Sequence, residues 1–301
     1  MTKRRLLFAI TAMLLLALGL DRFTTLPLSA AISHNRLATN RLATNRLATN
    51  RLATNRLATN ALSSTRLEAA EAANELLSTV EGRDLFSYLI GCALPPGTTI
   101  EATIPGAADT APPDSNYTCT SGRCSFDGSL GLAPDWIEHK LSSKDERWVS
   151  ACILARVNNF DTTEAISLRG PHPGLAVGDG EVELFGADEG AFYGNIFTHE
   201  DDPIEAYACQ GRTNSESPDS GGLALRACAK EDPANPGFTY CGFTYVGHCG
   251  NYDALFPQPY ACKNFDGAQG TFSECYEESR HGRWSGLRTH REVITVYVSG
   301  S

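Results

Sequence analysis

The chain carries little charge for its length, and none of it amounts to a basic excess. Charged residues make up 20% of the 301 residues, while 42% are hydrophobic. A chain of that composition can bury enough apolar surface to fold, unlike an ordinary disordered chain. The formal net charge is -10, whereas proteins that bind duplex nucleic acid carry a basic footprint. We therefore expect a folded protein that does not bind nucleic acid.

Short motifs of several large enzyme classes are also missing. The sequence contains no HExxH motif, no P-loop, no Rossmann glycine fingerprint and no GxSxG nucleophile elbow. It has no CxxC pair, so the close paired spacing of a zinc site is absent as well. We therefore predict no cofactor from motifs and assign no catalytic residue.

Only one long apolar run occurs, and it lies near the N-terminus. Lys3, Arg4 and Arg5 precede the run 6–20, and small residues follow at 29–31. This order predicts a secretory signal peptide over residues 1–31, because the run is shorter than the roughly 20 residues of a membrane-spanning helix. The alternative is a retained membrane anchor, since the small residues come late for a cleavage site. After removal of the signal we expect no membrane span.

A repeat follows the apolar run. The unit NRLAT fills residues 35–59, and a degenerate continuation reaches Ser64. A period of five suits neither one face of a helix nor one face of a strand. It resembles pentapeptide-repeat solenoids, but Asn and Arg stand where those proteins carry other residues. We interpret residues 32–63 as a spacer. Its regularly spaced arginines predict contact with an anionic envelope polymer or membrane surface, the alternative being that they simply keep the spacer soluble.

The repeat divides the charge of the chain unevenly. Nine of the 25 lysines and arginines, but only one of the 35 acids, fall within residues 1–65. The remainder therefore carries a net charge of -18. Acidic exported domains are often merely soluble, and some bind calcium.

Residues 64–301 are predicted to form one cysteine-rich globular domain of the α+β class. Apolar spacing predicts a helix from about Arg66 to Cys92, with a possible break at Gly82, and a second helix over 143–158. A strand is expected at 98–104 and a loop at 105–130. Further short strands are predicted at 165–168, 181–185, 191–197, 206–210, 223–229, 238–246 and 293–298. The expected architecture is two N-terminal helices packed on a sheet-rich, disulfide-stabilised domain.

All ten cysteines lie in this domain. An even number in an exported chain predicts structural disulfides. Proximity in sequence and in the predicted helices favours one set of pairs, although many others are possible. The favoured pairs are Cys92–Cys152, Cys119–Cys124, Cys209–Cys228, Cys241–Cys249 and Cys262–Cys275.

Four segments of the domain carry a family resemblance. They are YLIGCALPPG (88–97), RWVSACILARVN (147–158), ISLRGP (166–171) and EGAFYGNIF (189–197). With the signal peptide and the repeat, they resemble a group of uncharacterised secreted proteins from myxobacteria and related soil bacteria. The resemblance implies export and a bacterial envelope setting, and it implies no activity.

Acidic residues flank one predicted strand and suggest a metal site. Calcium prefers several oxygen ligands, and two acidic loops at the ends of a strand pair would supply them. A solvated acidic loop is the favoured alternative, because no regular ligand spacing appears. Glu189 and Glu200 would also serve as the carboxylate pair of a glycosidase. The candidate calcium ligands are Asp188, Glu189, Glu200, Asp201 and Asp202.

Other polar residues give less support to catalysis. Ser220 and His248 resemble segments of chymotrypsin-like proteases, but in reversed order, and Ser220 lies in a polar turn. The isolated histidines are expected on the surface, namely His139, His172, His281 and His290. We therefore predict a secreted or envelope-associated protein with a non-catalytic binding or structural role. The alternative is an extracellular hydrolase that acts on peptide or polysaccharide.

Overall fold

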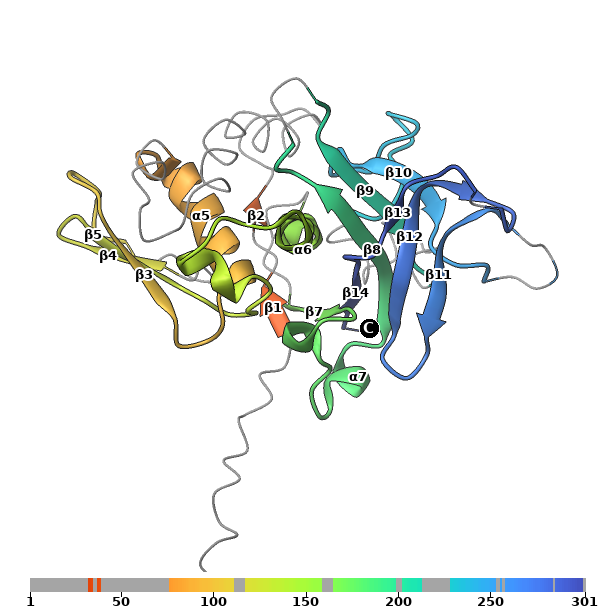
Figure 1. Ribbon diagram of the computed structural model, residues 1–301, viewed down its shortest axis with the longest axis horizontal. Coiled ribbons are helices and arrows are strands. Elements are labelled where there is room, and N and C mark those ends of the chain that lie inside the picture. Colours follow the sequence, from red (N-terminus) through yellow and green to blue (C-terminus); the bar gives the residue numbers. More distant parts are fainter. Residues whose placement is uncertain are drawn as a thin grey trace, which may run out of the picture.

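The computed structural model has a sheet-rich body with few helices, an α+β composition (Figure 1). The structure describes residues 32–34, 37–38, 76–110, 117–158, 165–198, 202–212, 228–252, 255, 258–283 and 285–299. Within this part, no helix combines the length and apolarity needed to cross a membrane. The signal-peptide prediction, most of the repeat and the Ser220 turn lie outside the described residues.

Two longer helices form the layer at the centre of Figure 1. Helix α5 (Val80–Ala93) begins after Thr79, whose hydroxyl accepts a hydrogen bond from the Gly82 N–H. Helix α6 (Ser143–Arg156) begins with a capping box between Ser142 and Asp145. Helix α6 covers most of the predicted 143–158 segment. The first predicted helix, from about Arg66 to Cys92, is described only from residue 76 onward, and α5 is its C-terminal part. Gly82 falls within α5 instead of breaking it.

A small three-stranded sheet lies beside α5. It has the order β3-β5-β4, with β3 (Thr99–Thr103), β4 (Tyr117–Thr120) and β5 (Arg123–Asp127). The predicted loop over 105–130 is therefore wrong in its second half. A two-residue turn joins β4 to β5, and both of its residues have positive φ, 51° at Ser121 and 78° at Gly122. Such turns match the twist of a hairpin. The Ser-Gly pair therefore joins two strands in a region whose composition favoured a loop.

The large sheet has nine strands in the order β1-β7-β14-β8-β9-β10-β11-β12-β13. Most neighbours are antiparallel, but β10 is parallel to both β9 and β11. The strands are β1 (Ile32–His34), β7 (Ala165–Arg169), β8 (Ala187–Asn195), β9 (Glu205–Gln210), β10 (Thr244–His248), β11 (Tyr260–Asp266), β12 (Thr271–Arg280), β13 (Thr289–His290) and β14 (Ile294–Val298).

The first residues of the predicted spacer also take part in sheets. Strand β1 pairs with β7, and β2 (Leu37–Ala38) runs parallel to β6 (Val157–Asn158). Because β2 belongs to the first NRLAT unit, the chain after the predicted signal peptide is joined to the domain by backbone hydrogen bonds before the repeat continues.

Several strand predictions are wrong. Residues Glu181–Leu184 form the short helix α7, which starts after Gly180 at a φ of 76°. A left-handed residue there allows a tight turn into helix. Of the segment predicted at 238–246 only the end belongs to a strand, β10. Strands β11, β12 and β13 were not expected, because their alternation of apolar and polar residues is incomplete.

The large sheet has two different faces. One face, called the helix face, carries buried apolar side chains and is covered by α6, which packs on β8 and β14. The opposite face, called the disulfide face, lines a smaller core that it shares with β11 and β12, strands of the same sheet, and β12 contacts both β14 and β10. The helix face comprises Ile166, Leu168, Phe192, Ile294, Val296 and Val298. The core of the disulfide face comprises Ala191, Tyr193, Cys209, Val246, Cys249, Ala261, Cys262, Phe272, Cys275 and Val293.

All ten cysteines are paired, and two predicted pairs are wrong. Three pairs agree with expectation, and the others are Cys209–Cys249 and Cys228–Cys241. The correction has a physical cause in the parallel alignment of β9 and β10. After a register shift, residues 210 and 248 are partners in that pairing, and the Cys249 N–H donates to the Gln210 carbonyl. Cys209 and Cys249 therefore come within 4.9 Å between Cα atoms. Sequence distance does not reveal a parallel neighbour. The expected pairs that agree are Cys92–Cys152, Cys119–Cys124 and Cys262–Cys275.

Candidate functional site

Asp188 is the predicted site residue with the most unusual surroundings. It lies at the start of β8, and its carboxylate Oδ2 accepts a hydrogen bond from the Arg212 backbone N–H at 3.2 Å. Gly211 packs directly on the carboxylate, because a Cβ there would lie 2.3 Å from Oδ1. Burial raises the pKa of Asp188 to about 6, against the smaller lowering effect of Arg212. The carboxyl group therefore keeps its proton to a higher pH than an ordinary aspartate.

Aromatic and basic groups surround this carboxylate on the disulfide face. Tyr297 is opposite Asp188 in the pairing of β14 with β8. The guanidinium of Arg169 stacks over the Tyr297 ring at 3.8 Å and donates to the Phe185 carbonyl at 2.7 Å. Burial, and then the charge of Asp188, raise the pKa of Tyr297 to about 12 and that of Tyr252 still further. Both phenols stay protonated and can donate hydrogen bonds at neutral pH.

The predicted calcium ligands do not all come together. Glu189 lies next to Asp188 at an irregular step in the pairing of β8 with β14, and its side chain is fully buried. Asp202 precedes β9, whose first residue pairs with the far end of β8. It therefore lies at the opposite end of the β8–β9 hairpin from Asp188. Glu200 and Asp201 lie outside the described residues, so the proposed set of five is untested as a whole.

Histidine 290 corrects the surface prediction. His290 is 1% exposed, and the centre of its ring lies 5.2 Å from that of the Tyr193 ring and 5.4 Å from that of the Tyr207 ring. Nε2 is buried and has no hydrogen-bond partner among the described residues. Burial, followed by the charges of Arg288 and Arg147, lowers the pKa of His290 to about 4, so the ring is neutral at pH 7.

The other histidines divide into two groups. His139 and His281 are exposed, as predicted. His172 is only partly exposed, and its Nδ1 accepts a hydrogen bond from the Gly174 N–H at 3.0 Å. His248 is half-buried and lies next to Tyr252. Its predicted partner Ser220 lies outside the described residues.

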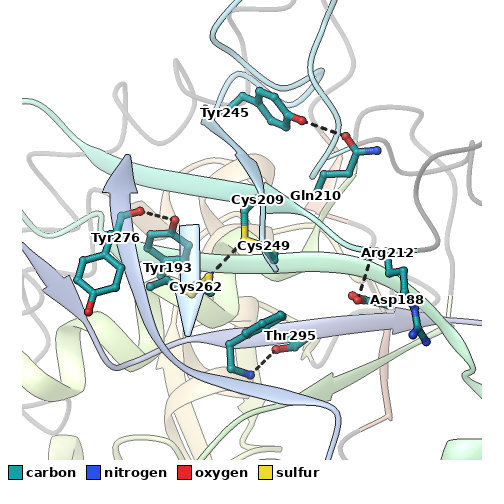
Figure 2. Close-up of a disulfide and its surroundings, with 12 residues drawn as sticks. Asp188, Tyr193, Cys209, Gln210, Arg212, Tyr245, Cys249, Cys262, Tyr276 and Thr295 are labelled. Carbon is teal, nitrogen blue, oxygen red and sulfur yellow. Dashed lines mark hydrogen bonds between the residues drawn. A yellow bond between two sulfur atoms is a disulfide. The ribbon is translucent and has the colours of Figure 1, made fainter. Parts of the chain in front are cut away.

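Two ion pairs border the buried histidine. Arg147 of α6 donates to Glu292 at 2.7 Å, and Arg288 pairs with Glu205 of β9. The hydroxyl of Tyr193 donates to the Tyr276 carbonyl at 2.6 Å, which Figure 2 shows. No sequence signal pointed to this cluster, because its residues come from five separate segments, namely α6, β8, β9, β12 and residues 288–292. The arrangement offers a neutral imidazole among aromatic rings, with charged groups at its edge.

Three cysteine sulfurs lie close enough together to suggest metal ligands. They belong to Cys209, Cys262 and Cys275. Each of these cysteines is oxidised in a disulfide, and the Sγ atoms of Cys209 and Cys262 lie 3.5 Å apart where the two disulfides touch (Figure 2). Because a metal needs the thiolate form, this cluster is the packed centre of the disulfide-face core.

Comparison with known proteins adds no further assignment. No protein family, curated protein or solved structure matches the chain. The resemblance to exported proteins of myxobacteria therefore stays a prediction, and the argument about function depends on the chemistry of the chain itself.

Proposed function

We propose that this protein is a secreted or envelope-associated, disulfide-stabilised protein with a non-catalytic binding or structural role. The observation that supports the proposal is the pairing of all ten cysteines in five disulfides. Such a framework belongs to a compartment outside the reducing cytoplasm. It also holds surface loops in fixed positions, which lowers the ordering cost of binding a partner.

The charge distribution suggests how the domain is held in place. Five arginines recur at fixed intervals in residues 35–59, while the chain after residue 65 has a net charge of -18. In this proposal the basic spacer binds an anionic envelope polymer and the acidic domain, repelled by the same polymer, projects from it. The five residues are Arg36, Arg41, Arg46, Arg51 and Arg56.

Retention on immobilised dextran sulfate, a model polyanion, tests this proposal. The purified oxidised chain should bind at low salt and elute as the ionic strength rises, because the contact is electrostatic. Replacement of the five spacer arginines by glutamine should abolish retention. The matched control replaces five exposed bases of the domain by glutamine and should leave retention unchanged. Equal retention of both variants would contradict a spacer-borne contact. The control positions are Arg123, Lys140, Lys144, Arg283 and Arg291.

One observation favours the alternative, an extracellular hydrolase. A carboxyl group with a pKa near 6, such as Asp188, suits general acid catalysis. Hydrolysis of peptidoglycan, casein or a polysaccharide that is lost in the Asp188→Asn variant would replace the binding proposal by this one. We expect no hydrolysis of any of the three by the wild-type chain.

A further inference from the structure

Strand β3 lies at the edge of the small sheet, and its outer edge has no strand partner among the described residues. The N–H groups of Gly128 and Ile104 donate to the carbonyls of Thr98 and Gly122, so the even-numbered residues of this segment bond to β5. The backbone groups of the odd-numbered residues therefore point to the outer edge, which is a template for an added strand. These residues are Thr99, Glu101 and Thr103.

The two faces of β3 differ in character. The odd-numbered side chains, Glu101 among them, are exposed, whereas Ile100 and Ala102 are partly buried against the main core. A cavity of about 410 Å³ lies beyond the end of β3, and its lining includes Leu77, Ile104 and Ala107. Ile104 and Ala107 also pack against the main core. A strand added to β3 would therefore direct alternate side chains to an exposed acidic face and to an inner face that ends in an apolar cavity.

The surroundings of this edge are acidic. Residues 76–110 and 117–127 include the first turn of α5 and the small sheet, and they contain five acids and two arginines. One of the arginines, Arg83, is 5% exposed and donates to the Leu77 carbonyl at 2.9 Å. The excess of negative charge favours a cationic partner. The acids are Glu81, Asp84, Glu101, Asp109 and Asp127.

The NRLAT unit has the properties that such an edge requires. Strand β2 (Leu37–Ala38) belongs to the first unit and pairs with β6, so this sequence already forms a strand in the structure. Four further units in residues 40–59 are identical to it. Arginine and leucine are adjacent in each unit, and in a strand they point to opposite faces. When the leucine points towards the cavity, the arginine lies on the same face as Glu101.

We propose that the outer edge of β3 binds an NRLAT unit from a second copy of this chain by strand addition. The leucine of the unit enters the apolar cavity, and its arginine pairs with Glu101. Each chain has five identical units but one β3 edge. The surplus units let one chain contact several copies at once, which strengthens the association. This inference goes beyond the proposed function, because the partner is the protein itself and not an envelope polymer.

Sedimentation velocity of the oxidised full chain over a range of concentrations tests the proposal without any polyanion present. We expect the average mass to rise with concentration, and a synthetic peptide of two units, residues 40–49, to reverse the rise. A peptide in which serine replaces both leucines should be at least tenfold less effective, because it has no apolar side chain for the cavity. A chain that stays monomeric, or association that the NRLAT peptide does not reverse, would overturn the proposal.

Two variants of one residue assign the association to the edge of β3. Glu101→Pro removes an outward N–H without breaking a bond to β5, and it should weaken the association at least tenfold. Glu101→Gln keeps this N–H and should weaken the association only about twofold to fivefold, through the lost charge. Glu183→Gln, an exposed change on α7, is the matched control and should have no effect.

A third variant tests the cavity separately. Ala107→Leu fills space that the leucine of the bound unit would occupy, and it should also weaken the association while the edge of β3 stays intact. This variant decides the question if circular dichroism shows that Glu101→Pro does not fold. Unchanged association in a folded Glu101→Pro or in Ala107→Leu would contradict the assignment.

Discussion

The two faces of the large sheet carry different kinds of side chain. On the helix face, fully buried aliphatic and aromatic side chains such as Phe192 and Val296 pack against α6. On the disulfide face, the next residue along the strand, Tyr193, lies beside a buried histidine and two touching disulfides. One sheet therefore separates a large, mainly apolar core, which includes three of the disulfides, from a smaller core in which four of the ten residues are disulfide-bonded cysteines.

The two faces also differ in the ionisable groups that they carry. The groups with strongly shifted pKa values in the large sheet, Asp188, His290 and Tyr297, are not part of the apolar helix-face core. Buried polar groups cost free energy unless they are well paired. A small core beside such groups has less apolar burial to offset that cost, so we expect it to depend more on its two disulfides than the larger core depends on its three.

The largest expected effect compares adjacent residues on the two faces. Phe192→Ala removes a fully buried ring that has an edge contact with Phe243. It should lower the free energy of unfolding by about 3–5 kcal/mol. Tyr193→Phe keeps the ring and removes the hydrogen bond to the Tyr276 carbonyl, at a cost of about 1–3 kcal/mol. Urea unfolding measures both values, and a greater loss in Tyr193→Phe would reverse the comparison.

The next effect concerns the disulfides. Cys209→Ala with Cys249→Ala opens a bond that spans 40 residues, and loop entropy predicts a loss of about 4 kcal/mol. Cys119→Ala with Cys124→Ala opens a bond that spans 5 residues, and the same argument predicts about 2 kcal/mol. Unfolding of both double variants under oxidising conditions checks the ranking. An equal loss in both would show that the disulfide face does not depend on its cross-links more than the small sheet does.

The pH dependence of stability should reveal two opposing groups. The lowered pKa of His290 means that the unfolded chain takes up a proton first, so its contribution is complete above about pH 6.5 and is lost as the pH falls towards 4. The raised pKa of Asp188 acts in the reverse sense: its carboxyl favours folding below pH 4 and disfavours it as the pH rises through 6. Each effect is on the order of 3 kcal/mol over its window.

Single variants separate these two groups. His290→Gln should leave a chain whose stability falls as the pH rises from 4 to 6, because Asp188 then acts alone. Asp188→Asn should leave a chain whose stability increases as the pH rises from 4 to 6, because His290 then acts alone. Thermal unfolding across this range distinguishes them, and identical pH profiles for both variants would contradict the assignment of the two pKa shifts.

The smallest effect concerns the helix layer. Thr79→Ala removes the cap of α5, and Ser142→Ala removes the capping box of α6. Each should cost about 1 kcal/mol. Because α6 covers the sheet, Ser142→Ala should also increase amide exchange in β8, whereas Thr79→Ala should not. Hydrogen exchange monitored by mass spectrometry checks this difference.

The sequence predicts elements whose signals are local. Ser142 and the apolar spacing after it mark the start of α6, and alternating apolar residues mark β8, β9 and β14. Glu181–Leu184 misleads because its apolar residues, Val182 and Leu184, alternate with acids as in a strand, and valine favours strands. The left-handed Gly180 that starts the helix gives no equally clear signal. Strands β11 and β12 escape prediction because only some of their residues are buried.

The candidate site is less predictable, because its partners are distant in the chain. An acid before a strand suggested Asp188, but Arg169 and Tyr297 reach it only through the order of the strands. His290 has no distinctive neighbours in sequence, and its burial follows from the pairing of β13 with β12. The pair Cys209–Cys249 likewise depends on β9 and β10 lying side by side.

The most direct test of the two-face account is hydrogen exchange of the chain before and after reduction of its disulfides. We predict that β7, β8 and β14, held against α6 by apolar burial, keep most of their protection, while β10, β11 and β12 lose theirs. Equal loss of protection in the two groups of strands, or retention by β10 to β12, would contradict the claim that β10, β11 and β12 depend on disulfides more than β7, β8 and β14 do.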